Sequence, residues 1–396
     1  LVRNGLVAEL GRGLSHANAR VIAADGLRAL PGLVDLHTHL REPGFEQSET
    51  VLTGSRAAAI GGFTAVHAMA NTSPVADTAG VVEQVMTLGE SAGYVTVRPI
   101  GAVTVGLEGT RLAEIGAMAE SRAAVRVFSD DGKCVHDALL MRRALEYTSA
   151  FGGVVAQHAQ EPRLTEGAQT HEGAISGELG LAGWPSVAEE SIIARDVLLA
   201  QHTGARLHVC HVSTAGSVEV LRWAKARGIR VTAEVTPHHL LLTDESVRSY
   251  DARFKVNPPL RTEADVLAVR AALAAGRYDD AARLARLLAA HEPLVADGHY
   301  LLGRALVESG HDDQALPALR RAVYLAPHAG LAHFLLAGAL ARCGDPSAAS
   351  REYRAAAQTL GRDPDEAAAP ELGGRSAREL AALCAQLEGQ LIRGTA

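Results

Sequence analysis

The sequence predicts an α/β fold: a (β/α)8-type barrel that lacks its eighth strand, followed by an all-α solenoid of helical repeats. Three observations lead to this prediction. Up to about Arg261, short β-rich runs alternate with amphipathic helical stretches, the pattern of a parallel sheet built from βα units. Only seven such strands can be counted. From about Glu263 onward the strand pattern stops, and small residues recur every 34 residues.

The seven expected strands are short runs of β-branched and other apolar residues bounded by turn-forming residues. Helical spacing between them, as in residues 139–150 and 217–226, predicts the helices that cover the sheet. A closed barrel needs an eighth strand, so the first and seventh strands are predicted to have unpaired edges. The strands are expected at residues 33–36, 64–69, 94–100, 124–128, 154–157, 206–210 and 229–235.

The last third of the chain repeats itself. Residues 264–361 resemble tetratricopeptide repeats, two good ones and a weaker first one, in which small residues let paired helices approach closely. They most resemble the repeats that follow the catalytic domain of some chemotaxis-receptor methyltransferases, and they imply a protein-binding surface. Residues 363–375 are expected to be a loop, and residues 376–392 a final amphipathic helix that caps the solenoid. The 34-residue interval is kept by Gly276, Gly310 and Gly344, by Ala281, Ala315 and Ala349, and by Pro293 with Pro327.

Composition excludes several classes of function. The formal net charge is 38 − 45 = −7 and no basic block is present, which argues against a nucleic-acid or membrane-surface role. No apolar run approaches the roughly 18 residues of a membrane span, and no signal peptide is recognised, so we expect a cytoplasmic protein. The four cysteines lie far apart without a CxxC pair and are expected to be reduced, packed thiols.

Candidate metal ligands follow several of the expected strands. Residues two apart on a strand face the same side, so His37 and His39 can share one metal ion. Later strands end next to Asp130 and Asp131, His158, and His211. Barrel active sites are built at the carboxyl ends of the strands, so these residue types favour a metal site there.

These blocks resemble the cyclic amidohydrolases, and among them the dihydroorotases of the longer bacterial class. The match runs in order through GLVDLHTHLREPG, HAMANTSP, VFSDDGKCVHD, LHVCHVSTAGS, TPHHLLLTDE and KVNPPLRTEADV. It divides the chain into a remnant of a small flanking β domain (1–30), an incomplete barrel (31–263), the repeats (264–361) and a tail with a capping helix (362–396).

The resemblance implies a binuclear zinc site that opens or closes the ring amide between dihydroorotate and N-carbamoyl-aspartate in pyrimidine biosynthesis. One zinc would be held by His37 and His39 and the other by His158 and His211. Asp131 would bridge the two ions, with its neighbour Asp130 as the alternative bridge. Substrate contacts are implied for Arg41 and Asn71, which match anchors of a carboxylate, and for Asn257, which matches a ring contact. The resemblance also suggests that His238 and His239 orient ligands.

One block of the family pattern is missing. In these enzymes the eighth strand ends in an aspartate that ligates zinc and transfers the proton, and no such strand follows residues 257–261 here. The closest match, Asp297, falls by the 34-residue interval at the start of a repeat helix. No catalytic residue is therefore identified, and the expected protein is a dihydroorotase-like zinc hydrolase with impaired or no turnover. Two alternatives remain open: a non-catalytic interaction protein acting through its repeats, and a join of two unrelated genes near residues 273–276.

Overall fold

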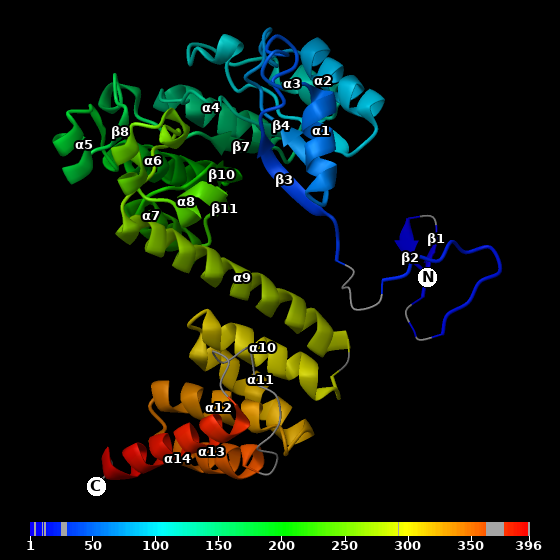
Figure 1. Cartoon of the computed structure of the whole chain (residues 1–396), viewed down its shortest axis with the longest axis vertical. Coiled ribbons are helices and arrows are strands. Elements are labelled where there is room, and N and C mark those ends of the chain that lie inside the picture. Colours follow the sequence, from blue (N-terminus) through cyan, green and yellow to red (C-terminus); the bar gives the residue numbers. More distant parts are fainter. Residues whose placement is uncertain are drawn as a thin grey trace. The chain divides into compact units, whose positions relative to one another are not determined.

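A computed structural model describes residues 1–3, 5–9, 11, 13–24, 30–291, 293–361 and 376–394. The loop expected over residues 363–375 lies outside the described residues. Contacts divide the chain into two compact units. Unit 1 comprises Leu1–Gly101 and Gly116–Val125, and unit 2 comprises Ala102–Ile115 and Arg126–Ala396. Figure 1 shows the elements of both units.

Unit 1 contains a three-stranded parallel sheet in the order β3-β4-β5, formed by Leu33–Thr38, Phe63–Ala68 and Thr96–Pro99. Helices α1 (Val51–Ile60) and α2 (Ala79–Ala92) connect these strands and share an apolar core with them. The helices approach the sheet closely: a Cβ at Gly89 of α2 would lie 2.4 Å from Val97 Cβ. The remaining elements of this part are the antiparallel pair β1 (Val2–Arg3) and β2 (Leu6–Val7), and α3 (Ile115–Glu120).

Unit 2 begins with a four-stranded parallel sheet in the order β11-β10-β7-β6. In register, Val209 of β10 lies opposite Gln157 of β7, so the carboxyl ends of these two strands are level. The strands are β6 (Val127–Phe128), β7 (Val154–Gln157), β10 (Leu207–Val209) and β11 (Val231–Ala233), and a separate short pair is formed by β8 (Thr170–His171) with β9 (Gly183–Trp184). The helices are α4 (Ala138–Ser149), α5 (Ala174–Leu179), α6 (Val187–Thr203), α7 (Ala215–Ala226) and α8 (Pro237–Leu241), with 3-10 turns at Val105–Leu107, Pro162–Leu164, Asp244–Ser249 and Ala252–Phe254.

The two parallel sheets contain all seven strands that the sequence predicts, and the α/β prediction is confirmed. Among the described residues after Ala233, the structure has only helices, turns and loops, as expected for a barrel without its eighth strand. β3 and β11, the first and the seventh of the predicted strands, are edge strands as expected. β5 and β6 are edge strands as well, because the seven strands form two separate sheets. Leu33, Val34 and Leu36 of β3 are each about half exposed.

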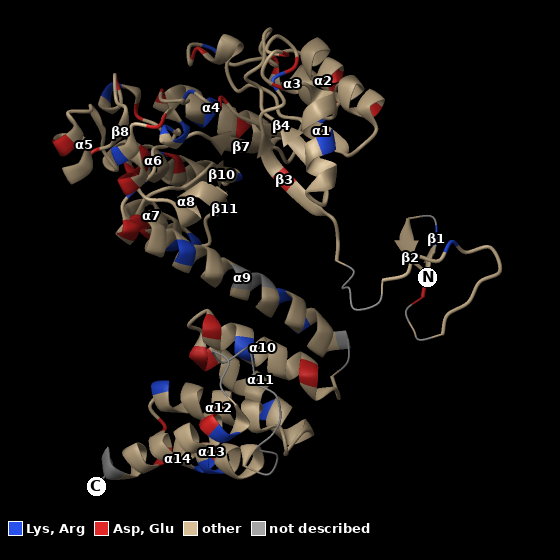
Figure 2. Cartoon of the chain, in the orientation of Figure 1, with Lys and Arg blue, Asp and Glu red and all other residues tan. Residues whose placement is uncertain are grey.

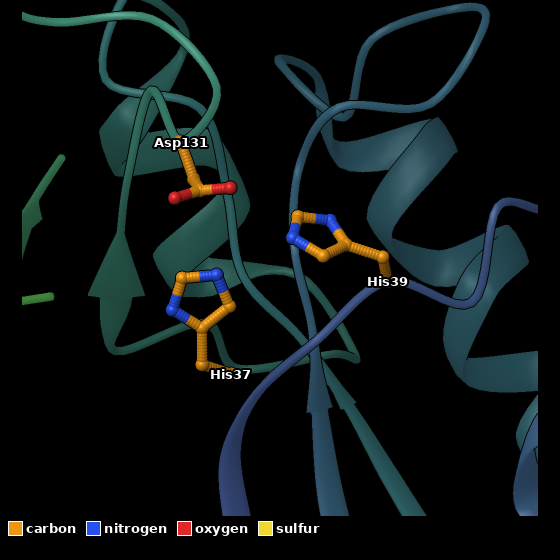
Figure 3. A group of neighbouring side chains, drawn as sticks. All are labelled: His37, His39 and Asp131. Atoms are coloured by element: carbon orange, nitrogen blue, oxygen red, sulfur yellow. The ribbon is translucent and has the colours of Figure 1, made fainter. Parts of the chain in front are cut away.

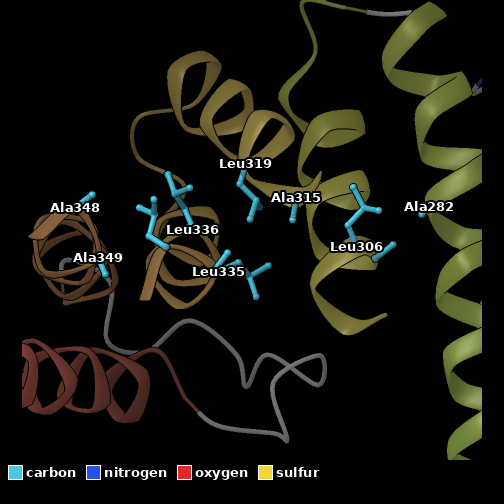
Figure 4. Close-up of a cluster of buried hydrophobic side chains, with 11 residues drawn as sticks. Ala282, Leu306, Ala315, Leu319, Leu335, Leu336, Ala348 and Ala349 are labelled. Carbon is cyan, nitrogen blue, oxygen red and sulfur yellow. The ribbon is translucent and has the colours of Figure 1, made fainter. Parts of the chain in front are cut away.

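The all-α part follows as predicted. Successive helices pack on one another, and an apolar cluster of Leu306, Ala315, Leu319, Leu336 and Ala349 runs through them (Figure 4). Helix α14 packs on α13 through Leu380 and Cys384, as expected for a final helix. The helices are α9 (Glu263–His291), α10 (Ala296–Glu308), α11 (Asp312–Leu325), α12 (Gly330–Arg342), α13 (Pro346–Leu360) and α14 (Ala377–Gly394). Asp297 lies in the first turn of α10, the helix-start position that its place in the repeat predicts.

The first expected repeat differs from the other two. Gly310 and Gly344 adopt positive φ (79° and 84°) in the turns between α10 and α11 and between α12 and α13. Gly276 instead lies inside the single 29-residue helix α9. None of these three glycines marks a close helix contact, since a Cβ added to any of them would meet nothing within 4 Å. Close approach occurs at Gly303, where a Cβ would lie 2.4 Å from Leu319 Cγ.

Charged residues of both signs are interspersed along the helices (Figure 2). No helix in the described part of the chain is long and apolar enough to cross a membrane. Among the cysteines, Cys134 and Cys384 are buried, and burial raises the pKa of their thiols to about 12 and about 11. Both are therefore neutral thiols near pH 7. Cys210 is buried as well, but Cys343 is exposed, so the prediction of packed cysteines is wrong for Cys343.

Candidate metal centre

His37 and His39 lie at the carboxyl end of β3 in unit 1, and both imidazole rings are drawn in Figure 3. Their ring centroids are 5.2 Å apart and the rings are nearly perpendicular. The strand end is held by Thr38, whose hydroxyl donates to the His67 carbonyl over 2.8 Å and whose own carbonyl accepts from the Met69 amide. The predicted pairing of these two histidines on one strand end is thus present.

Asp131, His158 and His211 meet in unit 2, each from the end of a different strand. Their exposed fractions are 4%, 2% and 6%. His158 Nδ1 lies 2.9 Å from His211 Nε2, and the Asp131 carboxylate lies 3.3 Å and 3.2 Å from these two nitrogens. A tetrahedral zinc with bonds of about 2.0 to 2.1 Å separates its ligand atoms by about 3.3 Å. The three side chains therefore fit one zinc ion in chemistry and in spacing.

The proton on His158 can be placed from its second contact. His158 Nε2 lies 2.9 Å from Gln160 Oε1, an oxygen that can only accept. Nε2 therefore carries the proton and donates, which leaves the lone pair of Nδ1 directed at the group. Gln160 orients the His158 ring, a contact that the sequence did not predict although the two residues are only two positions apart.

Asp130 and Asp131 are neighbours with different surroundings. The Asp130 carboxylate accepts the Val103 amide over 2.8 Å and the Thr104 amide over 3.0 Å, and the Thr104 hydroxyl donates to its other oxygen. Asp130 thus ties the residue 103–104 loop to the end of β6. Asp131 is the aspartate that faces the two histidines.

The three expected substrate contacts have unequal surroundings. For Arg41, the described residues supply no hydrogen bond or ion pair to the guanidinium, and the backbone adopts φ 61°, a strained value for a residue with a side chain. Asn71 Oδ1 lies 3.0 Å from His39 Nδ1, so this asparagine orients a histidine, a contact that the sequence did not predict. Asn257 is exposed, and its amide Nδ2 donates to Gln160 Oε1 over 3.5 Å.

His239 is buried and holds a loop. Its Nδ1 lies 2.7 Å from Thr236 Oγ1, and its Nε2 donates to the Pro258 carbonyl over 3.1 Å, next to Asn257. Burial, followed by the nearby charges of His238 and His211, lowers the pKa of His239 to about 3. A neutral imidazole with both nitrogens in hydrogen bonds supports the loop and does not ligate metal.

The part of the chain that carries the candidate metal ligands is similar to known proteins. The family model for dihydro-orotase-like proteins matches residues 26–217, which include every one of the candidate metal ligands. The dihydroorotase of Leifsonia xyli subsp. xyli is 78% identical over 279 residues, which is 70% of this chain and 64% of the relative. Residues 26–217 therefore match the dihydroorotase-like family. The dihydroorotase of Mycobacterium tuberculosis is 59% identical over 280 residues, again 70% of this chain and 65% of the relative.

The fold of this part of the chain is also similar to that of solved structures. An L-hydantoinase from Arthrobacter aurescens matches with a TM-score of 0.53 at 23% identity, over 62% of this chain and 56% of that chain. The dihydropyrimidinase of Brevibacillus agri matches with the same TM-score at 24% identity, over 67% and 60%. This chain spans just under two thirds of the length of the first dihydroorotases that it matches. A second family model, the bacterial transcriptional activator domain, matches residues 297–386 in the all-α part.

Proposed function

We propose that this chain is a zinc amidohydrolase of the dihydroorotase type, acting on dihydroorotate and N-carbamoyl-aspartate, with strongly impaired turnover. The observation that carries the proposal is the buried group of Asp131, His158 and His211, in a segment that is 78% identical to a dihydroorotase. Two imidazole nitrogens and a carboxylate oxygen are ligand types that zinc prefers in proteins, so the group favours metal binding.

The metal would be a zinc pair. We propose that His37 and His39 hold one ion, that His158 and His211 hold the other, and that Asp131 bridges them. The bridge is assigned to Asp131 because the Asp130 carboxylate already accepts three hydrogen bonds from residues 103–104. Zinc, when bound, supplies a Lewis acid and lowers the pKa of a water molecule to near neutral. The side chains of the protein would bind and orient the substrate.

Substrate binding is assigned to Arg41, Asn71 and Asn257. The Arg41 guanidinium, which has no partner among the described residues, is suited to a carboxylate, which it can bind through two parallel hydrogen bonds. Asn71 keeps its side-chain NH2 group for substrate while its oxygen orients His39. Asn257 and His158 both contact Gln160, so a ligand that moves Asn257 also bears on the metal group.

Turnover is expected to be low because the described residues after Ala233 offer no strand-borne aspartate. A positioned proton-transfer group contributes typically about 10² to 10⁴-fold to a rate. We therefore expect about two zinc ions per chain, and ring opening of dihydroorotate about 10² to 10⁴-fold slower than in a complete dihydroorotase. The test combines zinc analysis with a dihydroorotate assay, with His211→Asn as the control that removes a ligand. Protein without bound zinc after reconstitution would refute the proposal.

A second candidate is an interaction protein whose amidohydrolase part is an inactive scaffold located in the cytoplasm. The match of residues 297–386 to a separate family model favours a binding role for the helical part. Residues 264–396 used as bait should then capture a specific protein partner, and a bait that captures nothing specific would count against this candidate. The third candidate, a join of two unrelated genes near residues 273–276, is decided by sequencing the locus across that point.

A further inference from the structure

We propose that Glu189 and Arg261 are positioning residues that hold the loop carrying His211, and that they thereby set the metal affinity of the Asp131, His158 and His211 group. This inference rests on the proposed function. Neither residue belongs to the metal group, and both lie far from His211 in the sequence. Glu189 and Arg261 are 2% and 1% exposed.

Glu189, in the first turn of α6, accepts four hydrogen bonds from the residues that follow His211. One carboxylate oxygen accepts the Ser213 amide over 3.0 Å, the Thr214 amide over 3.3 Å and the Ser217 hydroxyl over 2.7 Å. The other oxygen accepts the Ser213 hydroxyl. A buried carboxylate with four such donors forms charge-assisted hydrogen bonds, which are among the strongest that a loop can make.

Arg261 also contacts Ser213. Its Nε donates to Ser213 Oγ over 3.0 Å, and its Nη1 donates to the Trp184 carbonyl and to His171 Nδ1 over 3.0 Å and 3.1 Å. Its Nη2 lies 3.9 Å from Glu189, so the charges of the two residues neutralise each other inside the protein. Ser213 is therefore fixed between a buried anion and a buried cation.

Such anchoring is needed because His211 is held in an unfavourable backbone conformation. Its φ is 34°, in the left-handed region that residues with side chains rarely adopt. A strained residue keeps such a conformation only when the surrounding contacts determine it. Ser213 lies two residues after His211, so the hydrogen bonds of Glu189 and Arg261 fix the backbone next to His211. This fixes the position of His211 Nε2, which lies 2.9 Å from His158 Nδ1.

The experiment measures Co²⁺ binding to the full chain by visible absorption. Glu189→Gln should weaken Co²⁺ binding by about 10 to 100-fold, the usual effect of losing a group that orients a ligand. Because a single variant leaves Arg261 unpaired and buried, the double variant Glu189→Gln/Arg261→Met is measured as well. It removes both charges and should fold, yet should still bind Co²⁺ weakly. Glu178→Gln, which breaks an exposed ion pair with Arg248, is the matched control and should bind Co²⁺ normally.

A second readout does not depend on metal. In chelator-treated protein, the ¹⁵N NMR signals of the His211 ring, identified by their loss in His211→Gln, should shift in the double variant. A folded double variant with wild-type Co²⁺ affinity would overturn the inference. If the wild-type protein binds no Co²⁺, the proposed function fails, and unchanged His211 ring signals in the double variant would then overturn the positioning role separately.

Discussion

The neighbours Asp130 and Asp131 are expected to give opposite phenotypes when each is changed to asparagine. Asp130→Asn keeps an oxygen for the Val103 and Thr104 amides but loses the acceptor of the Thr104 hydroxyl. Hydrogen bonds to a charged group contribute about 1.5 to 3 kcal/mol each. We therefore expect the free energy of unfolding to fall by about 2 to 3 kcal/mol, with metal affinity within about threefold of wild type.

Asp131→Asn should leave stability nearly unchanged but abolish tight metal binding. Groups that only orient a ligand change metal affinity by about 10 to 100-fold, so loss of a ligand should exceed about 100-fold, or about 2.8 kcal/mol. Urea unfolding with chelator present measures stability, and Co²⁺ titration measures affinity. The reverse pattern, in which Asp130→Asn loses the metal and Asp131→Asn loses only stability, would refute the assignment of the bridge.

Three further changes test the helical part. Gly276→Ala should raise the free energy of unfolding by about 1 kcal/mol because the residue lies inside a helix with open space around it, whereas Gly310→Ala should lower it by about 1 to 2 kcal/mol because φ is 79° there. A destabilised Gly276→Ala protein in urea unfolding would mean that the chain turns at Gly276. The hydrogen bond with Glu352 raises the pKa of His333 above its ordinary value. The His333–Glu352 pair therefore stabilises the folded protein fully below about pH 6.5, and this contribution is lost as pH rises through the higher folded-state pKa. His333→Gln should remove this pH dependence of stability. The control is His299→Gln, because His299 contacts the Pro293 carbonyl as His333 contacts the Pro327 carbonyl, and this variant should keep the pH dependence. Equal pH profiles for both variants would contradict the ion-pair explanation.

Strand positions could be predicted from the sequence, but strand lengths could not. The expected strand at residues 229–235 forms a strand only over Val231–Ala233. β11 is an edge strand and has a ladder on one side only, so its ends have no second neighbour to extend them. The 34-residue interval likewise predicts a turn at Gly276 in the first repeat, and this prediction is wrong. In the first repeat, α9 continues through Gly276, at a cost of about 1 kcal/mol relative to alanine, where the other two repeats have a turn.

The meeting of Asp131, His158 and His211 could be predicted because each follows the carboxyl end of a strand of one parallel sheet, and such a sheet brings those ends together. The residues that support them could not be predicted. Arg261 and Glu189 are 72 positions apart, and Asn71 reaches His39 across 32 positions. No local pattern marks such pairs, because their contact depends on how strands and loops that are distant in sequence are placed.

Helix α9 connects the α/β part of the chain to the helical repeats. Val266 and Val269 are buried where the first turns of α9 pack near α7 and α8, and Ala282 and Ala285 are buried where it packs on α10. Each of these alanines is 16 residues after its valine, which at about 100° per residue places it about 160° further around the helix.

The first half of α9 therefore buries one face and the second half buries nearly the opposite face. Leu284 and Leu287 are each 18 residues after a buried valine, or about five full turns, and so continue the first face. They are 59% and 63% exposed, because the contact with α7 and α8 has ended before them. The physical boundary between the barrel part and the solenoid thus falls inside α9, between Val269 and Ala282, where the buried face changes sides.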